Sequence, residues 1–181
     1  MWANFDKTSY DLPAFAAHVA TLRWTSWKPK GITLHNTGAP TLKQWVESGP
    51  SQQQRILNLQ SYYEGIHWHA GPHFFVSRSH VCGFSNPLAT GVHASCFNRD
   101  HLGMEMAGDF STEAFSTGDG AMVRDTACHA LAILFHAIGV DPRSGLNFHR
   151  QCAADHHACP GSNVHDADVL ARVLAAMPGS K

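Results

Sequence analysis

Charged side chains are scarce in this chain of 181 residues. They make up 15% of it, with 13 Lys and Arg against 14 Asp and Glu, so the formal net charge is −1 when the 14 His are counted as neutral. No run of Lys and Arg is present, and we therefore expect no nucleic-acid partner and no attraction to an anionic membrane surface. Apolar residues make up 44%, which favours a folded chain over a disordered one.

Three further patterns are missing. The first residues, MWANFDKTSYDL, show no basic segment followed by an apolar one, so we expect no signal peptide and synthesis in the cytoplasm. We expect no stretch with the apolar length of a membrane span, and hence no stable membrane association. The five cysteines have irregular spacing and form a poor disulfide framework, so reduced thiols are expected at Cys82, Cys96, Cys128, Cys152 and Cys159.

Helical and strand patterns are mixed along the whole chain. Apolar spacing predicts helices over about 12–22, 41–45, 51–63, 121–138 and 166–177, and strands over 31–35, 72–77, 81–84 and 101–106. No internal repeat or low-complexity linker divides them. We therefore predict a single α/β domain over residues 1–181, with a central mixed β-sheet flanked by α-helices.

Two segments carry candidate metal ligands. His35 ends the apolar strand GITLH, and on its own it is more easily explained as a histidine satisfied by backbone groups. The second segment, HRQCAADHHACPG, contains His149 and places Cys159 before a Pro-Gly turn. Two His and one thiolate suit zinc and leave a fourth tetrahedral position for water. Spacing alone leaves the choice open, because Cys152, His156 and His157 are also in reach and a structural zinc site could use four of these residues.

Five stretches together resemble the zinc-dependent N-acetylmuramoyl-L-alanine amidases. They are ITLHNTG, GPHFFVSR, TGVHAS, NRDHLGMEMAGDF and NFHRQCAADHHACPG, and they run from about Gly31 to Gly161. This superfamily includes phage endolysins, cytosolic muropeptide amidases and animal peptidoglycan recognition proteins. The resemblance implies zinc held by His35, His149 and Cys159 in a surface groove. Recognition proteins that bind without cutting typically lack this cysteine, so its presence favours an enzyme.

Glu105 is the candidate general base. It stands inside the apolar strand HLGMEM, where a buried carboxylate without a purpose is costly, although an exposed alternate position on an edge strand is also open. Relatives with a stretch similar to GMEMAG place their catalytic Glu here. Phage relatives often carry a Tyr where this chain has Pro72, which makes Glu105 the more needed group.

His157 departs from the pattern of the family. Relatives commonly have Lys two residues before the third ligand, where it stabilises the oxyanion. We expect His157 to take this catalytic role only while it is protonated, so activity should fall at high pH.

Three residues are candidates for contact with substrate. His93 matches a position that lines the groove in relatives, although a plain surface histidine is an equal alternative. Trp68 offers a stacking surface for sugar, although core packing is the more common role of such a ring. Asn36 follows the first ligand directly.

The implied reaction is hydrolysis of the amide bond between N-acetylmuramic acid and L-alanine in peptidoglycan or muropeptides, by a monomer. A phage or prophage endolysin is the favoured role, because Cys159 and the short chain resemble phage enzymes. A cytosolic recycling amidase is the alternative, because Glu105 and the ten-residue step from His149 to Cys159 resemble that type. A peptidoglycan-binding domain without catalysis and a domain with a structural zinc are two further alternatives.

Overall fold

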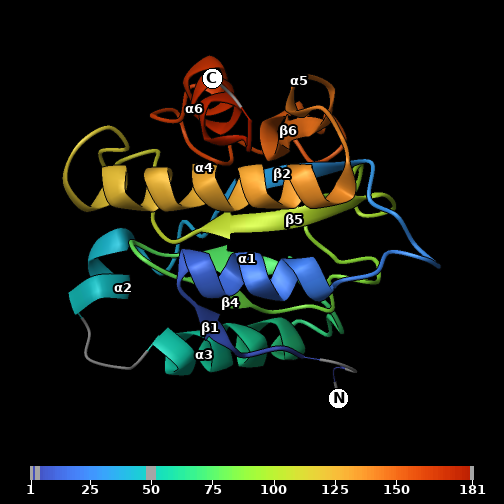
Figure 1. Cartoon of the computed structure of the whole chain (residues 1–181). Helices are drawn as coiled ribbons and strands as arrows, with labels where there is room; N and C mark the ends of the chain where they lie inside the picture. Colours follow the sequence, from blue (N-terminus) through green and yellow to red (C-terminus); the bar gives the residue numbers. More distant parts are fainter. Residues whose placement is uncertain (1, 3–4, 48–51, 180–181) are drawn as a thin grey trace.

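The computed structural model describes residues 2, 5–47 and 52–179, and it forms one α/β domain (Figure 1). The strands are β1 (Ser9–Tyr10), β2 (Gly31–Asn36), β3 (Phe74–Val76), β4 (Val81–Gly83), β5 (His101–Met106) and β6 (Leu146–Phe148). The helices are α1 (Leu12–Thr21), α2 (Leu42–Glu47), α3 (Gln52–Gly65), α4 (Gly118–Ile138), α5 (Pro142–Gly145) and α6 (Asp166–Ala176), with a 3-10 turn, η1, at His149–Gln151.

The six strands form one mixed sheet in the order β1-β4-β3-β5-β2-β6. The pairs β3–β5, β5–β2 and β2–β6 are parallel, whereas β4 runs antiparallel to both β3 and β1. Parallel strands end at a common edge of the sheet, so β2 and β5 bring residues far apart in sequence to one place. Their register sets His35 directly opposite Glu105.

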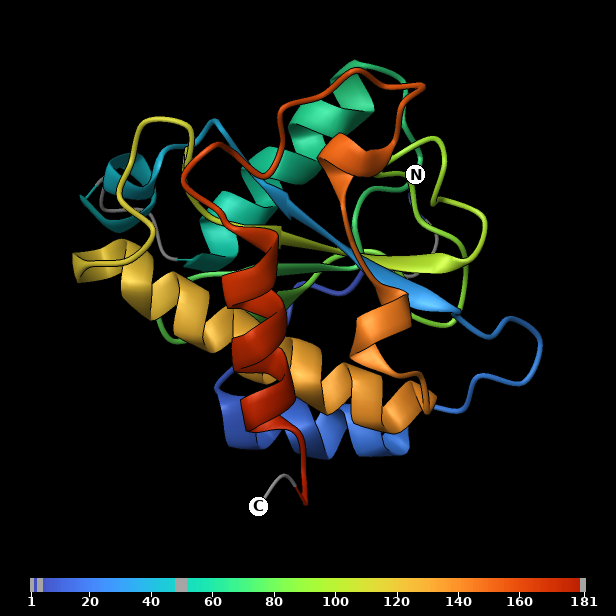
Figure 2. The same ribbon diagram turned by 90° about the horizontal axis from the view of Figure 1, so that it is seen from above.

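Helices cover both faces of the sheet (Figure 2). α1, α4 and α6 lie on one face, where Ile32 and Leu34 of β2 join a large buried cluster with residues of these helices. α3 lies on the other face, where Ile56 and Leu59 pack with Phe75 in a smaller cluster. Because side chains alternate along a strand, the apolar residues of β2 face α4 and His35 faces the side of α3.

Local sequence signals set the helix ends. The Asp11 side chain accepts a hydrogen bond from the Ala14 N–H at the start of α1, and Pro13 occupies the first turn. α4 ends at Ile138 and is capped by Gly139, which has the left-handed conformation (φ 69°) that favours glycine.

The mixed sheet, the flanking helices and the single α/β domain are as predicted. α3 begins at Gln52, and its expected start at Ser51 lies outside the described residues. The short elements β1, α5 and η1 were not predicted, because two to four residues carry too little periodicity to be recognised.

The expectation that no stretch is long and apolar enough to cross a membrane was wrong. α4 has 21 residues and a segment of mean hydropathy 1.2, which suffices by length and composition. Most of that segment is buried against the sheet and the neighbouring helices, as in the core helix of a globular domain.

Candidate metal centre and active site

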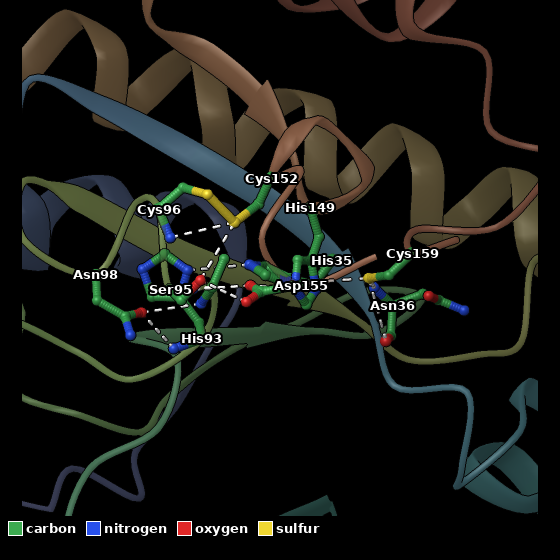
Figure 3. A network of polar contacts seen from close by, with 11 residues as sticks. His35, Asn36, His93, Ser95, Cys96, Asn98, His149, Cys152, Asp155 and Cys159 are labelled. Carbon is green, nitrogen blue, oxygen red and sulfur yellow. Dashed lines mark hydrogen bonds and ion pairs between the residues drawn. A yellow bond between two sulfur atoms is a disulfide. The ribbon is translucent and has the colours of Figure 1, made fainter. Parts of the chain in front are cut away.

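The candidate metal ligands converge where β2 meets the segment after β6 (Figure 3). His35 stands near the end of β2, His149 opens the 3-10 turn after β6, and Cys159 follows ten residues later. His35 and Cys159 are buried, His149 is 9% exposed, and one donor atom from each lies within 4.8 Å of the others. The structure thus brings together the three residues that the sequence resemblance selects.

Two of the three donor separations match those of a tetrahedral zinc ion. His35 Nδ1 lies 3.1 Å from His149 Nδ1 and 3.7 Å from Cys159 Sγ. Zinc–nitrogen and zinc–sulfur bonds of about 2.05 and 2.3 Å at tetrahedral angles separate the donors by about 3.3 Å (N···N) and 3.6 Å (N···S). The chemistry of the set, two imidazoles and a thiol, also suits zinc.

A hydrogen-bond chain orients His35. The backbone oxygen of His101 only accepts, so His93 Nε2, 3.2 Å away, carries the hydrogen. His93 Nδ1 then accepts from His35 Nε2 at 3.0 Å, which leaves the lone pair of His35 Nδ1 facing the other two donors. The His93 ring is fixed against β5, since a Cβ added to Gly103 would lie 2.6 Å from its Cγ.

A carboxylate orients His149 in the same way. Asp155 Oδ2 lies 3.1 Å from His149 Nε2, so this nitrogen donates and His149 Nδ1 keeps its lone pair for a metal. Asp155 is itself held by Ser95, whose backbone N–H donates to Oδ2 at 2.8 Å and whose hydroxyl donates to Oδ1. The Ser95 hydroxyl and backbone bonds and the nearby His149 lower the pKa of Asp155, which keeps it ionised.

Burial tunes the protonation of the ligands. Desolvation lowers the pKa of His35 well below its usual value, and the neighbouring histidines His93, His149 and His157 lower it further. Desolvation also lowers the pKa of His149, against the opposing effect of Asp155. Both imidazoles are therefore neutral near pH 7, which is the form that binds a metal.

Cys159 is positioned by backbone contacts. Its sulfur accepts from the Asn36 N–H at 3.3 Å, and its carbonyl accepts from the Arg150 N–H at 2.8 Å. Burial raises the pKa of the thiol to about 12 in the absence of a metal. Gly161 adopts φ 105°, and a Cβ there would lie 2.3 Å from the Phe110 carbonyl carbon, so this turn requires glycine.

Glu105 lies beside the ligands on the neighbouring strand. Desolvation raises the pKa of its carboxyl group to about 8, although the hydrogen bond from Tyr63 acts in the opposite direction. The Tyr63 hydroxyl, on α3, donates to Glu105 Oε2 at 3.3 Å. β5 is an inner strand between β3 and β2, so Glu105 is not at an exposed edge position.

A pocket of about 670 Å³ opens next to Glu105, and its volume lies within the usual range for ligand sites. The metal donors do not line this pocket. Glu105 therefore stands between the pocket and the donor set. The lining residues are Thr37, Ala39, Pro40, Gln44, Arg55, Asn58, Leu59, Tyr62, Tyr63 and Glu105.

The other predicted site residues lie around this centre. His157 is exposed and stacks on His149, with ring centroids 4.6 Å apart. Trp68 is 38% exposed and stacks on Tyr63 at 5.3 Å. The Asn36 side chain donates to the Gly108 carbonyl at 3.2 Å, and both ring nitrogens of His93 are engaged within the protein. Their contacts with substrate remain predictions.

The expectation of reduced thiols was wrong for one pair of cysteines. Cys96 and Cys152 form a disulfide, while Cys82, Cys128 and Cys159 are free. The two bonded residues are 56 positions apart, a separation that gives no sequence signal. The disulfide removes Cys152 from the possible ligands.

Sequence reasoning missed Asp155, Ser95 and Tyr63. Asp155 was weakly indicated by the sequence, because a carboxylate six residues after a candidate histidine ligand can serve as the hydrogen-bond partner of that histidine. Tyr63 stood at the end of the helix predicted over about 51–63, and nothing in the sequence indicated a contact with Glu105. Ser95 had no signal at all.

The fold and the donor set define an α/β domain with a His-His-Cys metal-binding group beside a carboxylate. The family model of the N-acetylmuramoyl-L-alanine amidases matches residues 25–162, and the chain belongs to that family. No curated protein sequence matches it.

Solved structures of similar fold include endolysins and a recognition protein. The endolysin amidase LysCS from Clostridium intestinale URNW has a TM-score of 0.61 and 17% identity, over 96% of this chain and 92% of its own. Drosophila PGRP-LB has a TM-score of 0.63 and 18% identity, over 99% and 92%. The Ph2119 endolysin of a Thermus scotoductus bacteriophage has a TM-score of 0.59 and 23% identity, over 83% and 88%.

Proposed function

We propose that this protein is a zinc-dependent amidase that hydrolyses the bond between N-acetylmuramic acid and the L-alanine of the stem peptide in peptidoglycan. The observation that carries the proposal is the donor set of His35, His149 and Cys159 next to Glu105, in a chain of this family. A domain that only binds peptidoglycan has no need for a carboxylate of raised pKa in register with a metal ligand.

The residues divide the chemistry between them. His35, His149 and Cys159 would hold the zinc ion, which would supply Lewis acidity to the water and to the scissile carbonyl. Glu105 accepts the proton of the attacking water on its carboxylate and returns it to the leaving amine nitrogen. The Tyr63 hydroxyl donates to Oε2 of that carboxylate, and a ring N–H of His157 donates to the developing oxyanion.

The pocket beside Glu105 is the proposed site for the stem peptide. Arg55 lines it, and its half-buried guanidinium offers positive charge to the carboxylates of such a peptide. The exposed face of Trp68, on the stack with Tyr63, suits the apolar face of a sugar. Drosophila PGRP-LB, of similar fold, has been solved in complex with tracheal cytotoxin.

The favoured setting is a phage or prophage endolysin, acting as a monomer on the cell wall after release from the cytoplasm. The Cys96–Cys152 disulfide supports action outside the cytoplasm, because disulfides persist in oxidising surroundings and are rare in cytosolic proteins. Glu105 and the ten-residue ligand spacing support the alternative, a cytosolic amidase of cell-wall recycling.

Substrate size separates these two roles. The zinc-loaded protein is incubated with intact sacculi and, separately, with soluble muropeptides, and the release of stem peptide is followed. An endolysin releases peptide from both, a recycling enzyme only from the soluble fragments, and a binding domain from neither. The Glu105→Gln variant serves as the control, because it keeps the metal ligands and loses the base.

A further inference from the structure

We propose that Asp155 is the positioning residue of His149, and that the Cys96–Cys152 disulfide, acting through Ser95, fixes Asp155 in place and thereby sets the zinc affinity of the site. This inference rests on the proposed function, because it takes His149 as a metal ligand. Figure 3 shows the disulfide, Ser95 and Asp155 side by side next to His149.

Asp155 connects the disulfide loop to the ligand. Its Oδ2 accepts both the Ser95 N–H at 2.8 Å and the His149 Nε2–H at 3.1 Å, and its Oδ1 accepts the Ser95 hydroxyl. A carboxylate partner fixes the tautomer and the orientation of a ligand imidazole and makes its other nitrogen more basic. The position of Asp155 therefore controls the lone pair that His149 offers to a metal.

The two loops that meet at Asp155 have little regular structure to hold them. Ser95 and Cys96 are exposed, and Asp155 lies in a turn segment with exposed neighbours on both sides. Exposed hydrogen bonds contribute little net stability. A covalent link between adjacent residues reduces the number of conformations in which these bonds are lost.

The disulfide is placed to do this. Cys96 directly follows Ser95, whereas Cys152 lies midway between His149 and Asp155 and its carbonyl accepts the Asp155 N–H at 3.1 Å. The Cys96 N–H also contacts Cys152 Sγ at 3.2 Å. Both ends of the Ser95–Asp155 contact are thus tied to one S–S bond.

The second imidazole ligand needs no such link. His35 is held by His93, whose ring packs against β5 and whose Nε2 bonds the His101 carbonyl of that strand. The sheet supplies the rigidity there. On the side of His149, where regular structure is sparse, the disulfide supplies the rigidity that the sheet supplies for His35.

The test is the zinc dissociation constant, measured by competition with a chromophoric chelator at pH 7. Asp155→Ala is expected to weaken zinc binding about 10- to 100-fold, and Cys96→Ala/Cys152→Ala about 10-fold in the same direction. The paired alanine variant leaves no free thiol at positions 96 and 152 that could compete for the metal. Asp168→Asn, on the exposed side of α6, is the matched control and leaves the constant unchanged.

A mutant cycle distinguishes positioning from general stabilisation. If the disulfide acts through Asp155, adding Asp155→Ala to the cysteine pair weakens zinc binding no further than Asp155→Ala alone. The visible spectrum of the cobalt-substituted protein should change in both variants, because the ligand field at the metal changes. If the disulfide only stabilises the fold, its removal lowers the melting temperature of the metal-free protein and leaves the zinc dissociation constant unchanged, and this result overturns the proposal.

Two outcomes separate this inference from the proposed function. If the wild-type protein binds no zinc, the proposed function fails and the inference fails with it. If wild type and all variants bind zinc equally and the wild type cuts muropeptide, only the inference is overturned. Ser95→Ala, which removes one donor to Asp155 and keeps the disulfide, replaces the cysteine variant if that variant does not fold, and the same weakening is expected.

Discussion

Tyr63 of α3 donates a hydrogen bond of 3.3 Å to Oε2 of Glu105 on β5. Burial raises the pKa of the Tyr63 hydroxyl, so it remains a donor throughout the neutral range. The sequence resemblance implies no tyrosine at position 72, because this chain has Pro72 where phage relatives often carry one. Here Tyr63 contacts the candidate base, Glu105, from α3, which packs on one face of the sheet.

Removing this hydroxyl should shift the pH profile of the enzyme. Tyr63 stabilises the ionised form of Glu105, so Tyr63→Phe raises the pKa of that carboxyl group. Because the base acts when deprotonated, the acidic limb of kcat/KM moves to higher pH, by about one unit. Tyr10→Phe, on the edge strand β1 and outside the pocket, is the control and leaves the profile unchanged. Equal profiles for all three proteins would contradict the role given to Tyr63.

Glu105 should also make the free energy of unfolding of the metal-free protein depend on pH. Its pKa is about 8 in the folded state against an ordinary value of 4.5, so the folded state keeps a proton that the unfolded state releases between these values. The free energy of unfolding therefore falls as pH rises from about 4.5 to 8. Glu105→Gln removes this loss. The free energy of unfolding of the variant minus that of wild type should therefore rise by at least about 1 kcal/mol between pH 5 and pH 8.5.

Urea unfolding in the presence of a chelator, at pH values from 5 to 8.5, measures this difference. Glu64→Gln, an exposed carboxylate on α3, is the control and should follow the wild-type pH dependence. A Glu105→Gln curve parallel to wild type would mean that the carboxyl group titrates normally in the folded state.

His93 offers a choice between two roles. As the partner of His35 it affects the metal, so His93→Ala should raise the zinc dissociation constant about tenfold with little change in KM at saturating zinc. As a substrate contact it would instead raise KM and leave zinc binding alone. Titrations with zinc and with muropeptide on the same preparation decide between them, with His69→Ala as an exposed histidine control.

His157 stacks on the ring of His149 and stands where relatives commonly have Lys. His157→Lys should extend the alkaline limb of the rate profile, because a lysine side chain stays charged to higher pH than an imidazole. An alkaline limb that is the same in the two proteins would refute the oxyanion role of His157.

The regular elements and the ligand set could be predicted from the sequence, whereas the contacts between loops could not. The apolar run before His35 predicted β2, and the Asp11 cap and Gly139 marked helix ends. The choice of His149 and Cys159 over Cys152 came from the resemblance to the family. Spacing could not exclude Cys152, because a disulfide between residues 56 positions apart depends on tertiary structure alone.

The same limit applies to the partners of the catalytic groups. Tyr63 meets Glu105 across 42 positions, and Ser95 meets Asp155 across 60. Such pairs depend on how a helix or a loop packs on the sheet, which periodicity within one segment does not determine. The register of β2 and β5, which sets His35 opposite Glu105, likewise arises only when the sheet forms.

The most direct measurement of the central claim is mass spectrometry of purified muropeptide after incubation with the zinc-loaded protein. We predict two products, a glycan free of peptide and a stem peptide with a free L-alanine amino terminus, whose masses sum to the substrate plus one water. Both products should be lost on chelation, restored by added zinc, and absent with Glu105→Gln. Intact muropeptide, cleavage at another bond, or equal cleavage by Glu105→Gln would contradict the account.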